Sequence, residues 1–286
     1  MGKLLVIIMN RGFALNIALT VLRRFLTERF YDQAAQTAYY LLLSMLPFFI
    51  FILSLLSLFP VNEEMLFRFL RPFLPEQSFA LIEDNVQEVL RNGKGRWLYL
   101  SLASAFWLSS VTVQSLARSL DLANGYVRKR GFWLSLFRDL GVTLLFMLIV
   151  PLSLLLPFIE NILHEVVSYY DRLDDWEGWL FLWPKVKWGL GTLFLFFFFL
   201  VFYKIVPSGK VLFRHVLPGA VLSAIGWQLF SYLFGDWVTA VDYTRLYGQF
   251  SGIIMLVVWL YMTAVIILVS GLLNTECRRA GKKGVE

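Results

Sequence analysis

The sequence predicts an all-α fold, a polytopic integral membrane bundle of six transmembrane helices with both termini in the cytoplasm. Three observations support this fold class. Hydrophobic residues make up 58% of the chain and charged residues only 16%, whereas a soluble domain usually carries about 25% charge. Six long stretches contain no Asp, Glu, Lys or Arg. Basic and acidic residues alternate between successive connections, as they do in multi-pass membrane proteins.

Each charge-free stretch is close to the length of about 20 residues that a helix needs to cross the hydrocarbon core of a bilayer. Because backbone groups in hydrocarbon must pair internally, each stretch is predicted to be helical. The six predicted spans are Gln33–Asn62, Trp97–Ala117, Leu140–Ile159, Trp188–Tyr203, His215–Gly235 and Leu246–Thr275. Their continuous apolarity disfavours a lipid-facing β-barrel, whose strands alternate between apolar and polar residues.

The charges of the connections predict the orientation of the bundle. The N-terminal segment, the second and fourth connections and the C-terminal tail carry most of the 26 basic residues. The first, third and fifth connections carry most of the 20 acidic residues. Since connections rich in Lys and Arg stay in the cytoplasm, both termini are predicted to lie there.

The segments outside the spans divide the chain further. Residues 1–36 are predicted to be a cytoplasmic or interfacial segment, residues 37–276 the membrane domain, and residues 277–286 a basic cytoplasmic tail. Apolar and basic residues mix in Arg11–Phe30, which is typical of an amphipathic helix on the inner membrane surface. A cytoplasmic helix packed on the bundle explains the same pattern. The apolar run Leu4–Met9 is too short for a signal peptide.

The first connection, residues 62–96, is too long for a simple turn. Asn62 resembles a helix start, Pro75 can begin a second helix, and Asn92-Gly93 can end it. We therefore expect an external helical hairpin over the bundle, acting either as a lid or as a packing element.

The second predicted span is the most polar. On a helical wheel its small polar residues fall on one face, which permits close helix packing and hydrogen bonds between helices. The same face could instead line a pathway for a substrate, and Gln228 of the fifth span could add to it. The candidate substrate-binding residues are therefore Ser101, Ser104, Ser109, Thr112 and Gln228.

The sequence offers no catalytic or metal-binding pattern and implies no cofactor. His164 and His215 are predicted to lie on opposite sides of the membrane, so they cannot share a metal site in one chain. No HExxH, CxxC or phosphate-binding glycine loop is present. The centres of the spans carry no charge, which argues against an ordinary proton-driven carrier. We expect no enzyme activity and no nucleic-acid partner. Proline residues predict kinked or broken helices at Pro47, Pro151, Pro157 and Pro218.

Four blocks of residues carry a family resemblance. They are Ala34-Ala35-Gln-Thr-Ala38-Tyr39-Tyr40-Leu-Leu-Leu-Ser44-Met-Leu-Pro47; Trp107-Leu-Ser109-Ser110 with Leu116-Ala117 and Asn124-Gly125-Tyr126; Val206-Pro207 with His215-Val-Leu-Pro218-Gly219-Ala220 and Trp227; and Tyr247-Gly248 with Gly252, Trp259-Leu260-Tyr261, Gly271 and Asn274. As an ordered set the blocks resemble the YihY/BrkB family of bacterial inner-membrane proteins. That family often has an acid soon after the final glycine, where this chain has Leu272 and Leu273, with Glu276 further on.

The resemblance implies six helices, both termini inside, and a place in the bacterial inner membrane. The family once carried a ribonuclease label, which this chain does not support, because a metal-dependent nuclease needs clustered His and carboxylate ligands. Relatives have been linked to virulence and to transport. The leading hypothesis is a transporter of a lipid or another lipophilic molecule. The alternative is a scaffold for envelope assembly. Expected partners are membrane lipids, a second copy of the chain or an envelope protein.

Overall fold

The computed structural model describes residues 2–56, 96–126, 133–147, 177–209, 211–240 and 248–283. Within these ranges the chain is helical apart from short turns and caps, which confirms the all-α fold class. The helices are α1 (Gly2–Thr27), α2 (Phe30–Leu56), α5 (Arg96–Asn124), α7 (Glu177–Ile205), α8 (Phe213–Ala240), a short 3-10 helix η3 (Gly248–Phe250) and α10 (Ser251–Lys283). Residues 133–147 are also helical.

Five of the described helices are long and apolar enough to cross a membrane. These spans are Phe30–Phe51, Tyr99–Asn124, Trp188–Ile205, Phe213–Val238 and Ser251–Gly281. They match the first, second, fourth, fifth and sixth predicted spans. The third predicted span is described only as far as residue 147, so the count of six stays a prediction. The expected external hairpin lies almost wholly outside the described residues.

Several helix ends differ from the predicted spans because capping contacts decide them. α5 continues to Asn124, past charged residues, and ends at Gly125, whose φ is 67°. The N–H groups of Gly125 and Tyr126 donate to carbonyls of the last turn, at 3.0 and 2.9 Å, which is a Schellman cap. α10 begins at Ser251 rather than Leu246, after η3 and the left-handed Gly248. Neither α2 nor α8 is interrupted at its proline.

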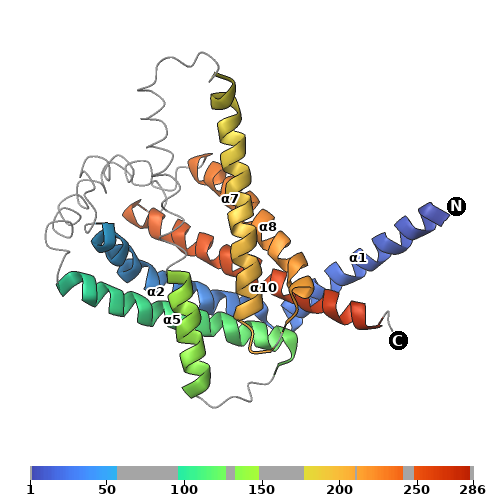
Figure 1. The fold of residues 1–286 in the computed structure, drawn as a ribbon, viewed down its shortest axis with the longest axis horizontal. Coiled ribbons are helices and arrows are strands. Elements are labelled where there is room, and N and C mark those ends of the chain that lie inside the picture. Colours follow the sequence, from blue (N-terminus) through green and yellow to red (C-terminus); the bar gives the residue numbers. More distant parts are fainter. Residues whose placement is uncertain are drawn as a thin grey trace.

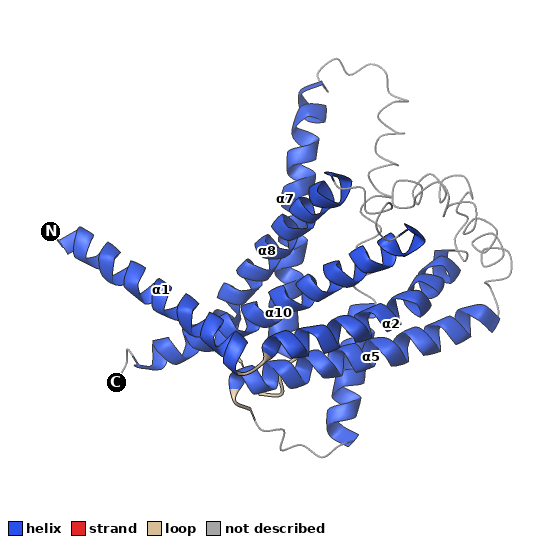
Figure 2. Ribbon diagram, turned by 180° about the vertical axis from the view of Figure 1, so that it is seen from behind, coloured by secondary structure: helices blue, strands red, loops and turns tan. Residues whose placement is uncertain are grey.

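Among the described long helices, two pairs and a central helix can be distinguished (Figures 1 and 2). α2 packs along α5, α7 packs along α8, and α10 contacts α2, α5 and α8. Small residues let these backbones approach closely, since Ala117, Ala220 and Ala264 are fully buried in the core. Phe146, from the helix at 133–147, contacts the rings of Phe198 and Phe202 on α7.

Part of α1 packs on the bundle, as one of the two interpretations of the sequence expects, and its place at the membrane surface stays a prediction. Its C-terminal part packs on α10 and α2, where Val21 is buried. The rest of α1 extends away from the bundle (Figure 2), and Leu15 and Leu19 are 62% and 55% exposed. An exposed apolar stripe beside basic residues suits a helix that lies at a membrane surface.

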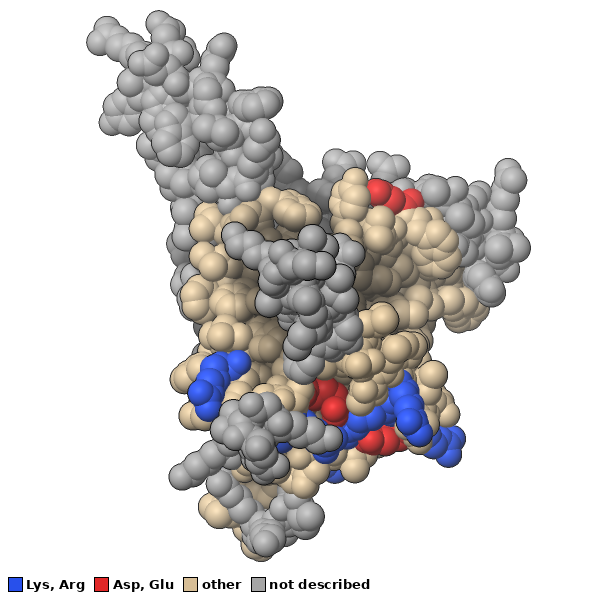
Figure 3. Space-filling view, turned by 90° about the vertical axis from the view of Figure 1, so that its right-hand side faces the viewer, with Lys and Arg blue, Asp and Glu red and all other residues tan. Residues whose placement is uncertain are grey.

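The outer surface of the bundle is apolar. Large side chains such as Trp107, Phe197 and Ile225 face outward on different helices. A soluble monomer rarely exposes so much contiguous apolar surface. In Figure 3 the described Lys and Arg side chains gather toward one end of the molecule, below a broad uncharged band. This distribution fits a protein whose middle lies in hydrocarbon.

Candidate functional site

The charged end of the bundle is where α1, α5, α7 and α10 end and α8 begins. Hydrogen bonds between these helix ends define it, since Arg24 of α1 reaches Glu276 of α10, and Asp121 of α5 reaches Ser208 just after α7. The same end carries the connections predicted to be cytoplasmic.

Asp121, Ser208 and Arg138 form a polar chain at this end. The Asp121 carboxylate accepts hydrogen bonds from the backbone N–H and the hydroxyl of Ser208, both at 2.6 Å. Ser208 accepts in turn from the Arg138 guanidinium at 3.0 Å, and Arg138 also donates to the carbonyls of Ile205 (2.8 Å) and Val206. Asp121 is only 3% exposed. The chain fixes the turn after α7 between α5 and the helix at 133–147.

A second cluster ties α1 to α10. The Arg24 guanidinium donates to both oxygens of Glu28 (2.6 and 2.9 Å), to Glu276 (2.7 Å) and to the carbonyl of Ala123 (3.1 Å). Glu276 also accepts from Arg279 at 3.0 Å. The hydrogen bonds to the Glu28 carboxylate, and then to Glu276, raise the pKa of Arg24 although partial burial opposes them. Glu276, the acid a few residues after Gly271, thus forms ion pairs with Arg24 and Arg279.

Amide and hydroxyl side chains join the remaining helices. Asn274 of α10 accepts a hydrogen bond from the backbone N–H of Gly219 on α8 at 2.7 Å. Thr275 donates to the Asn124 side chain at 3.1 Å, linking α10 to the end of α5. A Cβ at Gly219 would lie only 2.5 Å from the backbone oxygen of Ser270, so only glycine permits this approach.

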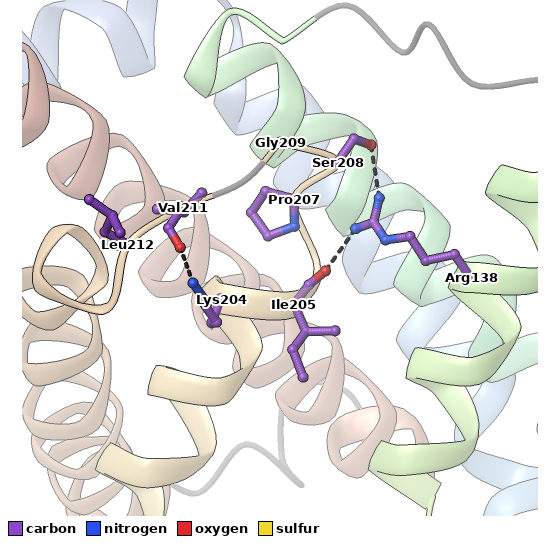
Figure 4. A pocket seen from close by; sticks show the side chains of 8 residues that line it. All are labelled: Arg138, Lys204, Ile205, Pro207, Ser208, Gly209, Val211 and Leu212. Carbon is purple, nitrogen blue, oxygen red and sulfur yellow. Dashed lines mark hydrogen bonds between the residues drawn. The ribbon is translucent and has the colours of Figure 1, made fainter.

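A pocket opens beside this end, between α7 and α8 (Figure 4). Its volume is about 450 Å³. Two cationic side chains, Arg138 and Lys204, lie on opposite sides of the turn between the helices, and Lys204 donates to the carbonyl of Val211. The pocket is lined by Arg138, Lys204, Ile205, Pro207, Ser208, Gly209, Val211 and Leu212. Two cations and no acid among these residues make it suited to an anion.

Four of the candidate residues predicted from sequence lie together on α5. Ser101 and Thr112 are buried, while Ser104 and Ser109 are half-buried. This face meets α2, since the hydroxyls of Ser115 and Thr37 are 3.2 Å apart. The hydroxyls of Ser104 and Thr112 donate to carbonyls one turn earlier on their own helix. The face is therefore closed against a neighbour in this structure.

Gln228 lies elsewhere. Its side-chain oxygen accepts a hydrogen bond from Thr192 of α7 at 2.5 Å, so it joins the α7–α8 pair. Ser223, on the same helix, lies 2.7 Å from the hydroxyl of Tyr203, which also donates to the carbonyl of Ile267. The structure thus separates Gln228 from the hydroxyls of α5.

The sequence did not single out Arg138, Asp121 or Lys204 as candidate site residues. One signal could have found them. Asn124, Val206-Pro207 and Asn274 belong to the blocks of the family resemblance, and each lies at or beside the charged end. Polar residues gathered at the ends of several spans therefore indicated a shared site.

The described part of the chain holds no group of three His, Cys, Asp or Glu side chains that could bind a metal ion. His215 accepts a hydrogen bond from its neighbour Arg214 at 3.3 Å. His164 lies outside the described residues. The expected absence of a metal, a cofactor and a catalytic residue stays a prediction.

The chain matches the protein family described as "Virulence factor BrkB" over residues 21–285. It is 29% identical over 252 residues to the putative ribonuclease-like protein YfkH of Bacillus subtilis, covering 88% of this chain and 91% of that protein. It is 26% identical over 252 residues to a UPF0761 membrane protein of Aliivibrio salmonicida, covering 86% of this chain and 78% of that protein. No solved structure matches the chain.

Proposed function

The chain belongs to the BrkB family of membrane proteins, and we propose that it moves a lipid or another lipophilic molecule across the bilayer. It is a multi-pass membrane protein, and the inner membrane is the usual location for its family. The ribonuclease-like name belongs to the Bacillus subtilis relative. A substrate that is itself apolar would need few buried charges along its path, in keeping with the uncharged centres of the spans.

The observation that carries the proposal is the line of hydroxyls on α5, formed by Ser101, Ser104, Ser109 and Thr112. It lies within the span Tyr99–Asn124. A hydroxyl that donates to its own helix still has lone pairs that can accept a hydrogen bond. A polar headgroup that donates hydrogen bonds could therefore pass along α5 without leaving a buried donor unpaired.

The arrangement of the helices gives a second support. α2–α5 and α7–α8 are separate pairs, and α10 bridges them. In many transporters one group of helices rocks against another around a fixed site. Such a motion would open surfaces that are packed here, including the face of α5 that meets α2. Gln228, at the contact of α7 and α8, lies apart from this face and is not needed for the proposed path.

The test is transbilayer movement of a fluorescent phospholipid in liposomes that contain the purified protein. The triple variant Ser101→Ala, Ser104→Ala and Thr112→Val removes the hydroxyls with little change in volume. We expect flux to fall about fivefold or more, since one hydrogen bond is worth about 1 kcal/mol. Ser110→Ala, on the opposite face of the same helix, is the matched control and should leave flux unchanged.

Equal flux through the triple variant and the wild type would remove the hydroxyls from the mechanism. Absence of flux for every lipid tried, together with a stable co-purifying envelope protein that is lost when residues 72–93 are deleted, would favour the scaffold instead. Either outcome is measured on the full chain, with thermal unfolding in detergent as the check that each variant folds.

A further inference from the structure

The pocket beside Lys204 lies where two candidate membrane spans meet their connection. It occupies the connection between two spans, which end at Ile205 and begin again at Phe213. The connection is one of those predicted to be cytoplasmic. Basic pockets between transmembrane helices on that side of a membrane are suited to anionic headgroups. Its volume, about 450 Å³, falls within the roughly 300–1,000 Å³ usual for small-molecule sites.

Lys204 retains the capacity to bind a ligand. An ammonium group has three N–H donors, and the structure gives one of them to the carbonyl of Val211. Its nitrogen also lies 4.7 Å from the centre of the Phe213 ring, which holds the side chain in place. None of the ion pairs among the described residues involves Lys204. Its charge therefore faces a pocket without an acidic lining residue.

Arg138 shapes the other side of the pocket. Its guanidinium donates hydrogen bonds to the Ser208 hydroxyl and the Ile205 carbonyl. The Ser208 hydroxyl in turn donates to the Asp121 carboxylate. The Tyr126 ring packs on Gly209, where an added Cβ would lie 2.4 Å from a ring carbon. Residues 205–209, which follow directly on α7, are thus held in place before any ligand binds, which lowers the entropic cost of binding.

The rim of the pocket is apolar. Leu212 and Phe213 are 55% and 57% exposed, and Ile205 is 37% exposed. Other apolar side chains of α7 and α8, such as Leu193 and Leu217, are exposed as well. Cations in a pocket beside an exposed apolar surface match a molecule with an anionic head and acyl chains. A free inorganic anion would gain nothing from that surface.

We propose that this pocket binds the phosphate group of an anionic phospholipid of the cytoplasmic leaflet, with Lys204 as its direct ligand and Arg138 as the residue that positions the turn. The site goes beyond the proposed transport function, because it would hold a headgroup whether or not the protein moves lipid across the bilayer. Binding is therefore measured without flux.

The test is lipid binding to the purified full-length protein in detergent, followed by native mass spectrometry. Dioleoylphosphatidylglycerol is compared with dioleoylphosphatidylcholine. We expect the wild type to prefer the anionic lipid and Lys204→Gln to weaken that binding about fivefold to tenfold, as loss of one basic headgroup contact should. Lys204→Arg should retain the preference. Arg118→Gln removes an exposed cation outside the pocket and is the matched control.

A second variant covers the case in which Lys204→Gln does not fold. Leu212→Asp places an acid on the exposed rim and should abolish the preference without disturbing the core. The proposal fails if the wild type binds both lipids equally, or if Arg118→Gln weakens binding as much as Lys204→Gln. It also fails if millimolar inorganic phosphate displaces the lipid as well as excess phosphatidylglycerol does, because the ligand would then be a soluble anion.

Discussion

Single residues determine how closely the helices of this bundle approach. Gly219 on α8 lies against Asn274 and Ser270 of α10, and its backbone N–H is bonded to the Asn274 side chain. In a membrane, where lipid is as apolar as a side chain, helices associate through such close packing and through hydrogen bonds. Gly219 therefore permits the close approach of α8 to α10, and Asn274 adds a hydrogen bond across that contact.

Gly219→Ala should destabilise the protein. The new Cβ would lie 2.4 Å from the Asn274 side-chain nitrogen and 2.5 Å from the Ser270 carbonyl oxygen. Overpacking of this kind costs about 1–3 kcal/mol, so we expect a lower midpoint of thermal unfolding in detergent. Gly226→Ala, on the same helix, meets only Ile266 at 3.6 Å and is the control. If both variants unfold at the wild-type temperature, α8 and α10 do not pack as described.

At the scale of elements, ion pairs as well as apolar packing hold α1 to the bundle. Only its C-terminal part packs on the bundle, and there Arg24 is 12% exposed between the carboxylates of Glu28 and Glu276. Salt bridges on an exposed surface contribute little, but breaking a buried one leaves a charge without its partner. The sequence indicated the amphipathic character of α1. It gave no indication that α10 would supply the ion-pair partner.

Arg24→Ala should release α1 from the bundle. Glu276 would lose its closest cation, at a cost of about 3 kcal/mol, which is the lower end for breaking a buried pair. We expect faster hydrogen–deuterium exchange in residues 15–27, while α5 and α10 remain protected. Arg23→Ala, one position earlier and exposed, should leave exchange as in the wild type. Equal exchange in the two variants would contradict a role for the ion pair.

At the scale of the whole molecule, the ends of the helices reveal the topology. α5, α7 and α10 all end at the charged end, and α8 begins there, as the hydrogen bonds of Asp121, Ser208 and Asn274 require. The described helices therefore run in the directions that the charge pattern predicts, with α5 and α7 ending on the same side. Both α5 and α7 arrive at the same end, so positions after each must lie on the same side of the membrane.

Labelling with a membrane-impermeant maleimide tests this topology. Cys277 is the single cysteine in the sequence, so Cys277→Ser gives a cysteine-free background. In intact cells, Leu122→Cys and Leu212→Cys at the charged end should stay unlabelled. Asp236→Cys, near the other end of α8, should react. Labelling of Leu122→Cys but not Leu212→Cys would place α5 and α7 in opposite directions and overturn the arrangement.

The sequence by itself determined the class of the protein, five of its membrane helices and its family, because hydrocarbon forces each long apolar stretch to satisfy its own backbone as a helix. Only the tertiary structure showed which polar side chains lie together at the charged end. Asp121 and Ser208 are 87 positions apart, and Arg24 and Glu276 are 252 apart. Which polar side chains meet over such separations depends on how each helix rotates and crosses its neighbours. Helical periodicity within one span was enough to place the hydroxyls of α5 on one face. Hydropathy carries no information on how that helix rotates against its neighbours, so the pocket of Lys204 and Arg138 could not be predicted.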